Sequence, residues 1–301
     1  MHVLWLKTEL LHPLDKGGKI RTYHMLRGLR ERAHVTYLTL DDGTAAPDAR
    51  AGAREYSNDL IAVPFSPPAK GTPAYYAALV RNLASRLPYA VARYRSPAMR
   101  EAIIGAVGDR KVDLVVCDFL VPAVNYPVGL GVRSVLLQHN VEAAIWARHT
   151  LVARSFVVPA YMSEQWRRMR AFERRECRRF DHVAAVSEVD RDTFRDEYGV
   201  TAVSAIPTGV DVDFFRPSRT TVAPAAEIVF VGSMDWMPNS DAVNWFVADI
   251  LTLVRAQIPD VTLTIVGRDP RPDVQTLAGR IPGVTVTGTV PDVRPYLERS
   301  A

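Results

Sequence analysis

Leu114-Val115-Val116-Cys117 is the stretch that decides the fold of this 301-residue chain. It is a short run of apolar residues without a polar break. A strand that is apolar at every position must be covered on both faces, as the strands of a buried parallel sheet are. Because such a sheet carries helices on both sides, the run predicts an α/β fold.

Runs of the same kind recur through the first two-thirds of the chain and alternate with longer helical patterns. This alternation is typical of parallel sheets with crossover helices. We expect strands at Val3–Leu6, Val35–Leu40, Leu60–Pro64, Val112–Cys117, Ser134–Gln138, His182–Val186 and Val203–Ile206. We expect helices at Gly18–Arg32, Pro73–Arg86, Pro97–Val107, Ser163–Arg179 and Val189–Glu197.

The sequence changes character after residue 215. Residues 216–226 are mostly small, include prolines and show no periodicity, which is typical of an interdomain linker. We therefore expect one domain over residues 1–215 and a second over 227–301. In the second we predict strands at Ile228–Val231, Val261–Val266 and Val284–Thr287, and helices at Asn239–Val254, Val274–Arg280 and from Val293. Since doubly wound nucleotide-binding domains have about five or six strands, we expect this domain to be incomplete.

Composition and charge exclude several classes of protein. Hydrophobic residues make up 48% and charged residues 23%, which is typical of a globular protein with a sizeable core. The net charge is +4, but the segment 166–180 alone holds seven arginines and two glutamates. The rest of the chain is close to neutral, so we expect no broad basic face and no nucleic-acid partner.

Location follows from what the sequence lacks. Cys117 and Cys177 are too few for a disulfide framework and have no metal-type spacing. The N-terminus is apolar for only four residues before Lys7, and no run of about 18 apolar residues occurs. We expect a cytoplasmic protein.

The arginine-rich segment 166–180 allows two interpretations. Trp166, Met169, Phe172 and Phe180 recur at helical spacing among the arginines, a composition typical of a helix lying on an anionic membrane. That would place the protein at the inner face of the plasma membrane. Alternatively, the apolar stripe packs on the sheet and the arginines face solvent. The sequence leaves both open.

Two adjacent glycines, Gly17 and Gly18, begin the helix that follows the first strand. They let the backbone approach a ligand closely, and a helix N-terminus favours an anion. The loop lacks the spacing of a P-loop. We assign Gly17, Gly18 and Arg21 to the binding of an anionic ligand; the alternative is a tight turn without a ligand.

His139 and Glu142 follow the strand Ser134–Gln138. Open α/β sheets bind ligands at the carboxyl ends of their strands, so we expect both side chains to line a substrate crevice. Asn140 is a candidate N-cap of the next helix, and a helix start is the alternative explanation of this cluster. Ser187, at the end of another strand, is either an N-cap or a crevice residue.

The residues from Ile206 to Pro217, with Pro207-Thr208-Gly209-Val210-Asp211 at their centre, resemble the hinge of the family-four retaining glycosyltransferases. Phe230–Ser233, Pro259–Gly267 and Val286–Asp292 are similar to the start of the donor domain in that family, which is also described as glycosyl transferases group 1. Gly17-Gly18 and His139 match, in order and position, its diphosphate-side loop and its active-site histidine. The resemblance spans the whole chain.

The resemblance implies a GT-B fold, in which two Rossmann-like, doubly wound parallel-sheet domains face a crevice. It implies transfer of a hexose from a UDP- or GDP-linked sugar to a glycan, lipid-linked or small-molecule acceptor, with retention of configuration. Neither a cofactor nor a metal is implied, because the nucleotide sugar is a co-substrate. His139 and Glu142 are the expected catalytic residues. The further donor- or acceptor-binding residues are Ser187, Gly209, Gly232, Ser233, Asn239, Arg268 and Val290.

The chain departs from the family in two places. The Arg and Lys that usually follow the Gly232 position are replaced by Ser233-Met234-Asp235-Trp236-Met237-Pro238-Asn239. The Met-Pro-Asn version resembles a subgroup associated with bacterial surface-polysaccharide loci. In this chain we expect Arg268 or later residues to contact the phosphates instead. The family's downstream pair of glutamates is absent, so we expect residues 1–301 alone to be inactive. A GT-B sugar-nucleotide epimerase and a non-catalytic nucleotide-sugar-binding protein are the alternatives.

Overall fold

The computed structural model describes residues 1–152, 157–216 and 226–300, without the side chains of 149–152 and 157–159. These residues form two compact units, unit 1 (Met1–Gly209) and unit 2 (Val210–Ala301). The boundary lies inside the predicted first domain, which extends to residue 215. The predicted linker at 216–226 lies, apart from its two end residues, outside the described residues.

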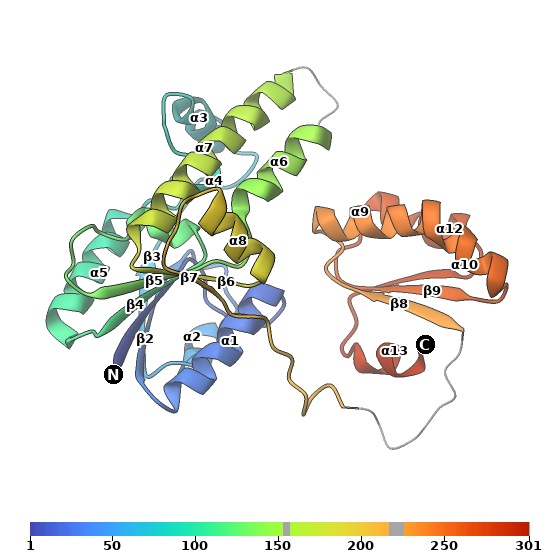
Figure 1. The fold of residues 1–301 in the computed structure, drawn as a ribbon, viewed down its shortest axis with the longest axis horizontal. Helices are drawn as coiled ribbons and strands as arrows, with labels where there is room; N and C mark the ends of the chain where they lie inside the picture. The colour runs from blue at the N-terminus through green and yellow to red at the C-terminus, as the bar shows by residue number, and fades with distance from the viewer. Residues whose placement is uncertain (153–156, 217–225, 301) are drawn as a thin grey trace. The chain divides into compact units, whose positions relative to one another are not determined.

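Unit 1 is built on a seven-stranded parallel sheet in the order β3-β2-β1-β4-β5-β6-β7 (Figure 1). Its strands are β1 (His2–Lys7), β2 (His34–Asp41), β3 (Asp59–Pro64), β4 (Leu114–Asp118), β5 (Arg133–Leu137), β6 (His182–Ala185) and β7 (Val203–Ala205). Its helices are α1 (Gly17–Arg30), α2 (Ala49–Gly52), η1 (Ala53–Glu55), α3 (Pro73–Asn82), α4 (Tyr89–Ala92), α5 (Pro97–Arg110), η2 (Val121–Asn125), α6 (Glu142–Val152), α7 (Val157–Arg179) and α8 (Glu188–Asp196). Every strand predicted for this part of the chain is present.

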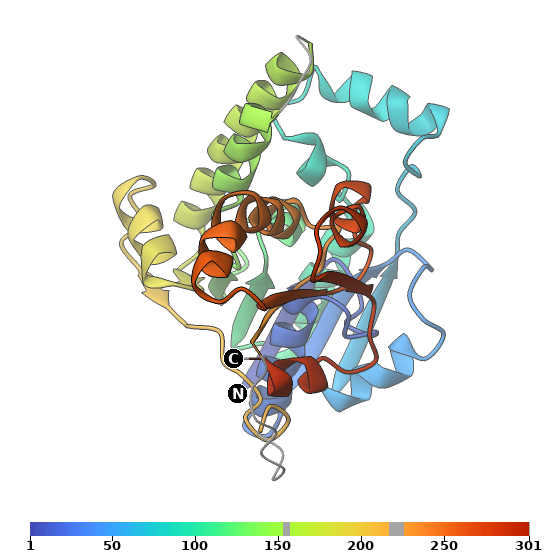
Figure 2. The ribbon, with the colours of Figure 1, turned by 90° about the vertical axis from the view of Figure 1, so that its right-hand side faces the viewer.

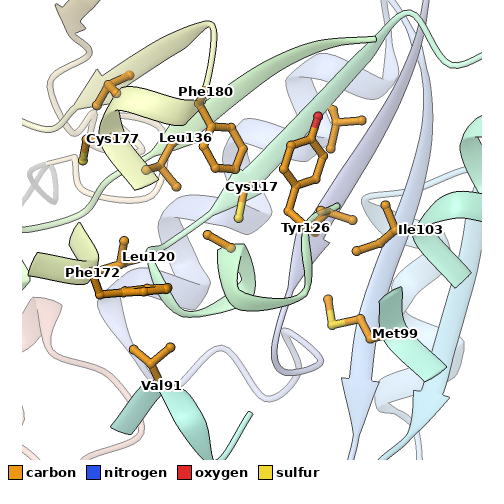
Figure 3. Packing of buried hydrophobic residues seen from close by; sticks show 14 of the residues in the cluster. Val91, Met99, Ile103, Cys117, Leu120, Tyr126, Leu136, Phe172, Cys177 and Phe180 are labelled. Carbon is orange, nitrogen blue, oxygen red and sulfur yellow. The ribbon is translucent and has the colours of Figure 1, made fainter. Parts of the chain in front are cut away.

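The strands of unit 1 bury both faces because alternate residues enter separate cores. On β1, Val3 and Trp5 join the cluster that contains Tyr23 and Leu26 of α1. Leu4 and Leu6 join the opposite cluster. Figure 3 shows the second cluster, in which Met99 and Ile103 of α5 and Phe172 and Cys177 of α7 pack around Cys117 and Leu136 of β4 and β5.

Helix α7 contains the arginine-rich segment and begins six residues before its predicted start at Ser163. Met169, Phe172 and Phe180 are buried in the core of unit 1. Arg168 and Arg179 donate to backbone carbonyls of neighbouring segments, including those of Asn82 and Tyr126. Three of the four residues of the apolar stripe therefore pack inside unit 1, as the second interpretation of this segment expects, whereas Trp166 is half-buried.

Unit 2 is smaller. Its three-stranded parallel sheet has the order β10-β9-β8, from β8 (Glu227–Val231), β9 (Thr262–Val266) and β10 (Val284–Gly288). Its helices are α9 (Met237–Trp245), the π-helical η3 (Phe246–Ile250), α10 (Leu251–Gln257), α11 (Pro272–Gln275), α12 (Leu277–Arg280) and α13 (Arg294–Arg299). One core cluster joins α9, η3 and α10 to the central strand β9. No helix among the described residues is long and apolar enough to cross a membrane.

Candidate active site

The order of strands in unit 1 reverses direction between β1 and β4, which are neighbours in the sheet although β2 and β3 come between them in sequence. Ligands of open α/β sheets bind beside the carboxyl ends of the strands at such a reversal. Lys7 ends β1 and Asp118 ends β4. The topology therefore places these two charged residues at the position where a site is expected.

Asp118 is the centre of a buried polar network. Its Oδ2 atom accepts hydrogen bonds from Lys7 Nζ at 2.8 Å, Thr22 Oγ1 at 2.6 Å and Trp5 Nε1 at 3.0 Å. Its Oδ1 atom lies 2.7 Å from His139 Nε2. The side chains of Lys7 and Asp118 are 2% and 0% exposed, so this is a fully desolvated ion pair. Such a pair is tolerated only where further hydrogen bonds satisfy both groups, and this network supplies them.

The network shifts the pKa values of Asp118 and His139. Burial acts to raise the pKa of Asp118, but the charge of Lys7 and the hydrogen bond with His139 outweigh it and hold that pKa well below its usual range. Burial lowers the pKa of His139, and Lys7 and Arg21 lower it further, against the effect of Asp118. Because an ionised carboxylate only accepts hydrogen bonds, His139 donates through Nε2. A neutral ring then leaves Nδ1 as an acceptor.

The ring of Phe119 packs against one face of the His139 ring. The two rings stack with centroids 3.7 Å apart and an interplanar angle of 5°. Phe119 has a φ of 74°, a conformation that bulky residues rarely adopt. Lys7 Nζ lies 4.3 Å from the centre of the Phe119 ring. Strained backbone of this kind tends to occur at functional sites, and here it directs the Phe119 ring against His139.

The two adjacent glycines have different surroundings. A Cβ atom on Gly18 would lie 2.7 Å from Phe119 Cζ, whereas one on Gly17 would meet nothing within 4 Å. Gly18 therefore makes room for the ring that stacks on His139. The N-cap residue of α1, Lys16, provides no side-chain cap, and the first turn contains no acidic residue, so the N-terminus of α1 suits an anion.

Arg21 is buried one turn into α1. Its Nη2 donates to the carbonyl of Ile206 at 2.6 Å, which ties α1 to the segment before Gly209. Its Nη1 is buried without a hydrogen-bond partner among the described residues. Burial lowers the pKa of Arg21, while Asp118 opposes that shift. A buried guanidinium with an unused donor suits an anionic ligand.

Glu142 begins α6 but is not joined to His139 by a hydrogen bond or ion pair within the described residues. Its backbone N–H and that of Ala143 donate to the carboxylate of Glu173, at 2.8 and 3.0 Å. Glu173 of α7, rather than the side chain of Asn140, therefore caps α6. Burial and the Glu173 carboxylate raise the pKa of Glu142 to about 7.

Ser187 is the N-cap of α8, and its Oγ accepts from the backbone N–H of Asp190 at 3.1 Å. This is the first of the two roles that the sequence left open. Gly209 is exposed at the end of unit 1, and a Cβ atom there would meet nothing within 4 Å.

In unit 2 the structure brings four of the predicted donor-binding residues together after β8 and β9. Arg268 Nε donates to Ser233 Oγ at 2.9 Å, and Asn239 Nδ2 donates to the Ser233 carbonyl at 3.0 Å. The Arg268 guanidinium also pairs with Asp235 at 3.3 Å. Gly232 fits against the Asn239 amide, which is 2.7 Å from where its Cβ would be. The half-buried Val290 follows β10, the other neighbour of β9.

Sequence reasoning missed Lys7, Asp118 and Phe119. Lys7 was visible as a cation directly after an apolar strand, and Asp118 as an anion after another. Reading the two together requires knowing that β1 and β4 are neighbours, which sequence spacing does not give. Gly267 ends one of the motifs quoted for the resemblance but was not among the predicted site residues. Its Cβ would lie 1.6 Å from the Gly232 carbonyl oxygen, so the ends of β8 and β9 touch through their backbones.

Comparison with known proteins gives matches along both units. Residues 16–214 match the family described as Glycosyltransferase Family 4, and residues 225–301 match Glycosyl transferases group 1. No curated protein sequence matches the chain.

Several solved structures are similar. The crystal structure of TarM has a TM-score of 0.64 at 8% identity, over 99% of this chain and 78% of that chain. An S. aureus TarM mutant in complex with Fondaparinux, alpha-GlcNAc-glycerol and UDP has a TM-score of 0.60 at 9% identity, over 99% and 79%. Medicago truncatula UGT71G1 complexed with UDP-glucose has a TM-score of 0.52 at 9% identity, over 98% and 73%. At these identities the likeness shows the fold alone, which is GT-B with two Rossmann-like domains, as predicted.

Proposed function

Since this chain belongs to glycosyltransferase family 4, we propose that it transfers a hexose from a UDP- or GDP-linked sugar with retention of configuration. The acceptor is a glycan, a lipid-linked sugar or a small molecule. UDP is the first donor nucleotide to test, because the solved structures of TarM and UGT71G1 named above contain UDP or UDP-glucose.

One observation carries the proposal: the charged network that holds His139 at the carboxyl ends of β4 and β5. The hydrogen bond from His139 to Asp118 and the stack on Phe119 fix the ring in one orientation. In that orientation Nδ1 accepts a hydrogen bond from a hydroxyl group of the transferred sugar. A fixed, neutral acceptor positions a sugar without a change in protonation during the reaction. Asp118 is then a positioning residue that acts through His139.

Two sets of groups are suited to the donor phosphates. In unit 1 they are the uncapped N-terminus of α1 and the unused Nη1 of Arg21. In unit 2 they are the backbone at Gly232 and the side chains of Ser233 and Arg268. Arg268 already contacts Ser233 and Asp235, so a phosphate would replace or share these contacts.

Donor binding is tested by thermal shift of the 301-residue chain with UDP, GDP and their sugars. A bound nucleotide raises the melting temperature in proportion to the logarithm of its concentration above Kd. We expect one base to give the larger shift, and Arg268→Ala to reduce it. The absence of a shift with every nucleotide would contradict donor binding.

The role of His139 is tested by turnover of the full-length gene product, the form in which we expect transfer. His139→Ala should lower kcat by roughly 100-fold or more, in the range seen when one preorganised hydrogen bond is lost, with little change in KM for the donor. Asp118→Asn should lower kcat less and shift its pH profile, because it alters the tautomer of His139 and not the ring itself. NMR analysis of the product should show a retained anomeric configuration. An inverted product would refute the proposed stereochemistry, and an epimerised donor sugar would favour the epimerase alternative.

A further inference from the structure

Helix α3 presents an apolar face to solvent. Tyr76 and Val80 of α3 and its C-cap residue Leu83, which keeps helical backbone angles, are 57%, 67% and 56% exposed. At 100° per residue these three positions fall within about 60° of one another, so they form a single stripe. A surface helix ordinarily turns its polar residues outward and its apolar residues inward. In α3 the buried side instead includes Asn82, whose amide donates to the carbonyl of Leu87 at 3.1 Å.

The surroundings of this stripe are cationic. Residues 61–100 contain six lysines and arginines and no aspartate or glutamate. Lys70, Arg81 and Arg86 are exposed before, within and after α3. The neighbouring α7 brings Glu164, which is already paired with Arg167 at 2.7 Å and Arg168 at 2.6 Å. The stripe is therefore apolar at its centre and positively charged around it.

Helix α3 projects from unit 1 away from the sheet, at the end where the α6–α7 hairpin also lies (Figures 1 and 2). Arg168 of α7 holds it there by donating to the carbonyls of Asn82 at 2.8 Å and Leu83 at 3.0 Å. These bonds fix the C-terminal end of α3 to α7 and leave Tyr76, Val80 and Leu83 outward.

We propose that α3 docks unit 1 on an anionic phospholipid surface. Tyr76, Val80 and Leu83 enter the boundary between headgroups and acyl chains, while Lys70, Arg81 and Arg86 contact the phosphates. A second copy of the chain is a poorer occupant, because a symmetric contact through the same stripe would bring like charges together. The inference does not depend on the proposed transfer reaction. It also assigns the membrane contact to α3 instead of α7, where Met169 and Phe172 are buried.

The test is flotation of the 301-residue chain with vesicles of phosphatidylglycerol and phosphatidylcholine, and with vesicles of phosphatidylcholine alone. We expect binding to the anionic vesicles only, weakening as salt is raised. Val80→Asp should weaken binding about tenfold, since it places a charge where the stripe enters the lipid. Arg81→Gln should weaken it about fivefold, the loss of one cation near an anionic surface.

The matched control is Val128→Asp, the same change at a loop position that is 75% exposed and outside α3. It should bind as the wild type does, and all variants should keep the wild-type circular dichroism spectrum. The proposal is overturned if the wild type does not float with anionic vesicles at low salt. It is equally overturned if Val80→Asp and Val128→Asp bind alike, or if Val80→Asp abolishes a dimer while vesicle binding stays unchanged.

Discussion

The two units differ in the contacts that neighbouring strands make at their carboxyl ends. In unit 1 the ends of β1 and β4 carry opposite charges, which neutralise each other through two buried side chains. In unit 2 the ends of β8 and β9 meet through the backbones of Gly232 and Gly267, and the nearby ion pair of Arg268 with Asp235 stays partly exposed. Unit 1 thus buries charged side chains in a hydrogen-bonded network, whereas unit 2 keeps half-buried backbone at Gly232 and Gly267, where the proposed function has the donor phosphates bind.

The first prediction compares the two ion pairs, and it carries the largest expected effect. Asp118→Ala leaves the buried Lys7 ammonium without its counter-ion and should destabilise the folded chain by about 3–5 kcal/mol. Asp235→Ala, at a residue whose side chain is 44% exposed, should change stability by less than about 1 kcal/mol. Urea unfolding measures both. Lys7→Met combined with Asp118→Leu should recover much of the loss; equal effects at Asp118 and Asp235 would remove the contrast between the units.

The second prediction tests the backbone contact in unit 2. Gly267→Ala introduces a Cβ 1.6 Å from the Gly232 oxygen, so β8 and β9 must separate at their ends. We expect a loss of roughly 3 kcal/mol, the upper part of the range for overpacking. Gly279→Ala in α12, where a Cβ meets nothing within 4 Å, is the matched control and should be neutral or slightly stabilising. Hydrogen exchange should place the loss in β8–β10 and leave β1 and β4 protected.

Some secondary-structure elements could be predicted from the sequence and others could not. The strands were predictable because continuous apolar runs such as Leu114–Cys117 have few alternatives in a chain of this composition. Short helices such as α2 and α4 were missed, since four residues give no periodicity. The predicted helix Asn239–Val254 is interrupted by a π-helical turn at Phe246–Ile250, which no residue in the sequence marks.

The candidate site was predictable only in part, because its residues are joined by topology. His139 could be found from its position at the end of a strand. Its partner Asp118 lies 21 residues earlier in sequence, and only the pairing of β4 with β5 brings the two within 2.7 Å. The role of Ser187 as an N-cap was readable from local sequence, while the capping of α6 by Glu173 was not, since 31 residues separate Glu173 from Glu142.

The third prediction concerns Gly17 and Gly18, to which the sequence analysis gave the same role although their surroundings in the structure differ. Gly18→Ala pushes against the Phe119 ring, which cannot move freely because it stacks on His139. We expect a loss of about 2 kcal/mol and a fall in turnover, because the ring of His139 shifts with Phe119. Gly17→Ala should be neutral or stabilising by up to about 1 kcal/mol. The measurements are the unfolding midpoints of the two variants and their donor turnover in the full-length gene product. Equal values for Gly17→Ala and Gly18→Ala would contradict this explanation.

The smallest expected effect concerns Glu142. Its carboxyl is harder to ionise in the folded chain, whereas Asp118 stays ionised although it is buried. The usual pKa of this carboxyl is 4.5, and burial together with Glu173 raises it to about 7 in the folded chain. Between these values the folded chain keeps a proton that the unfolded chain has released. The contribution of Glu142 to stability is therefore fully present below pH 4.5 and is lost as the pH rises through 7. Glu142→Gln removes the ionisation, so it should match the wild type at pH 4 and be more stable by about 1–2 kcal/mol at pH 8.

Glu101→Gln, at an exposed position of α5, is the control and should shift the urea midpoint little at either pH. A Glu142→Gln variant that is no more stable than the wild type at pH 8 would show that the Glu142 carboxyl is hydrated in the folded chain and keeps a pKa near its usual value.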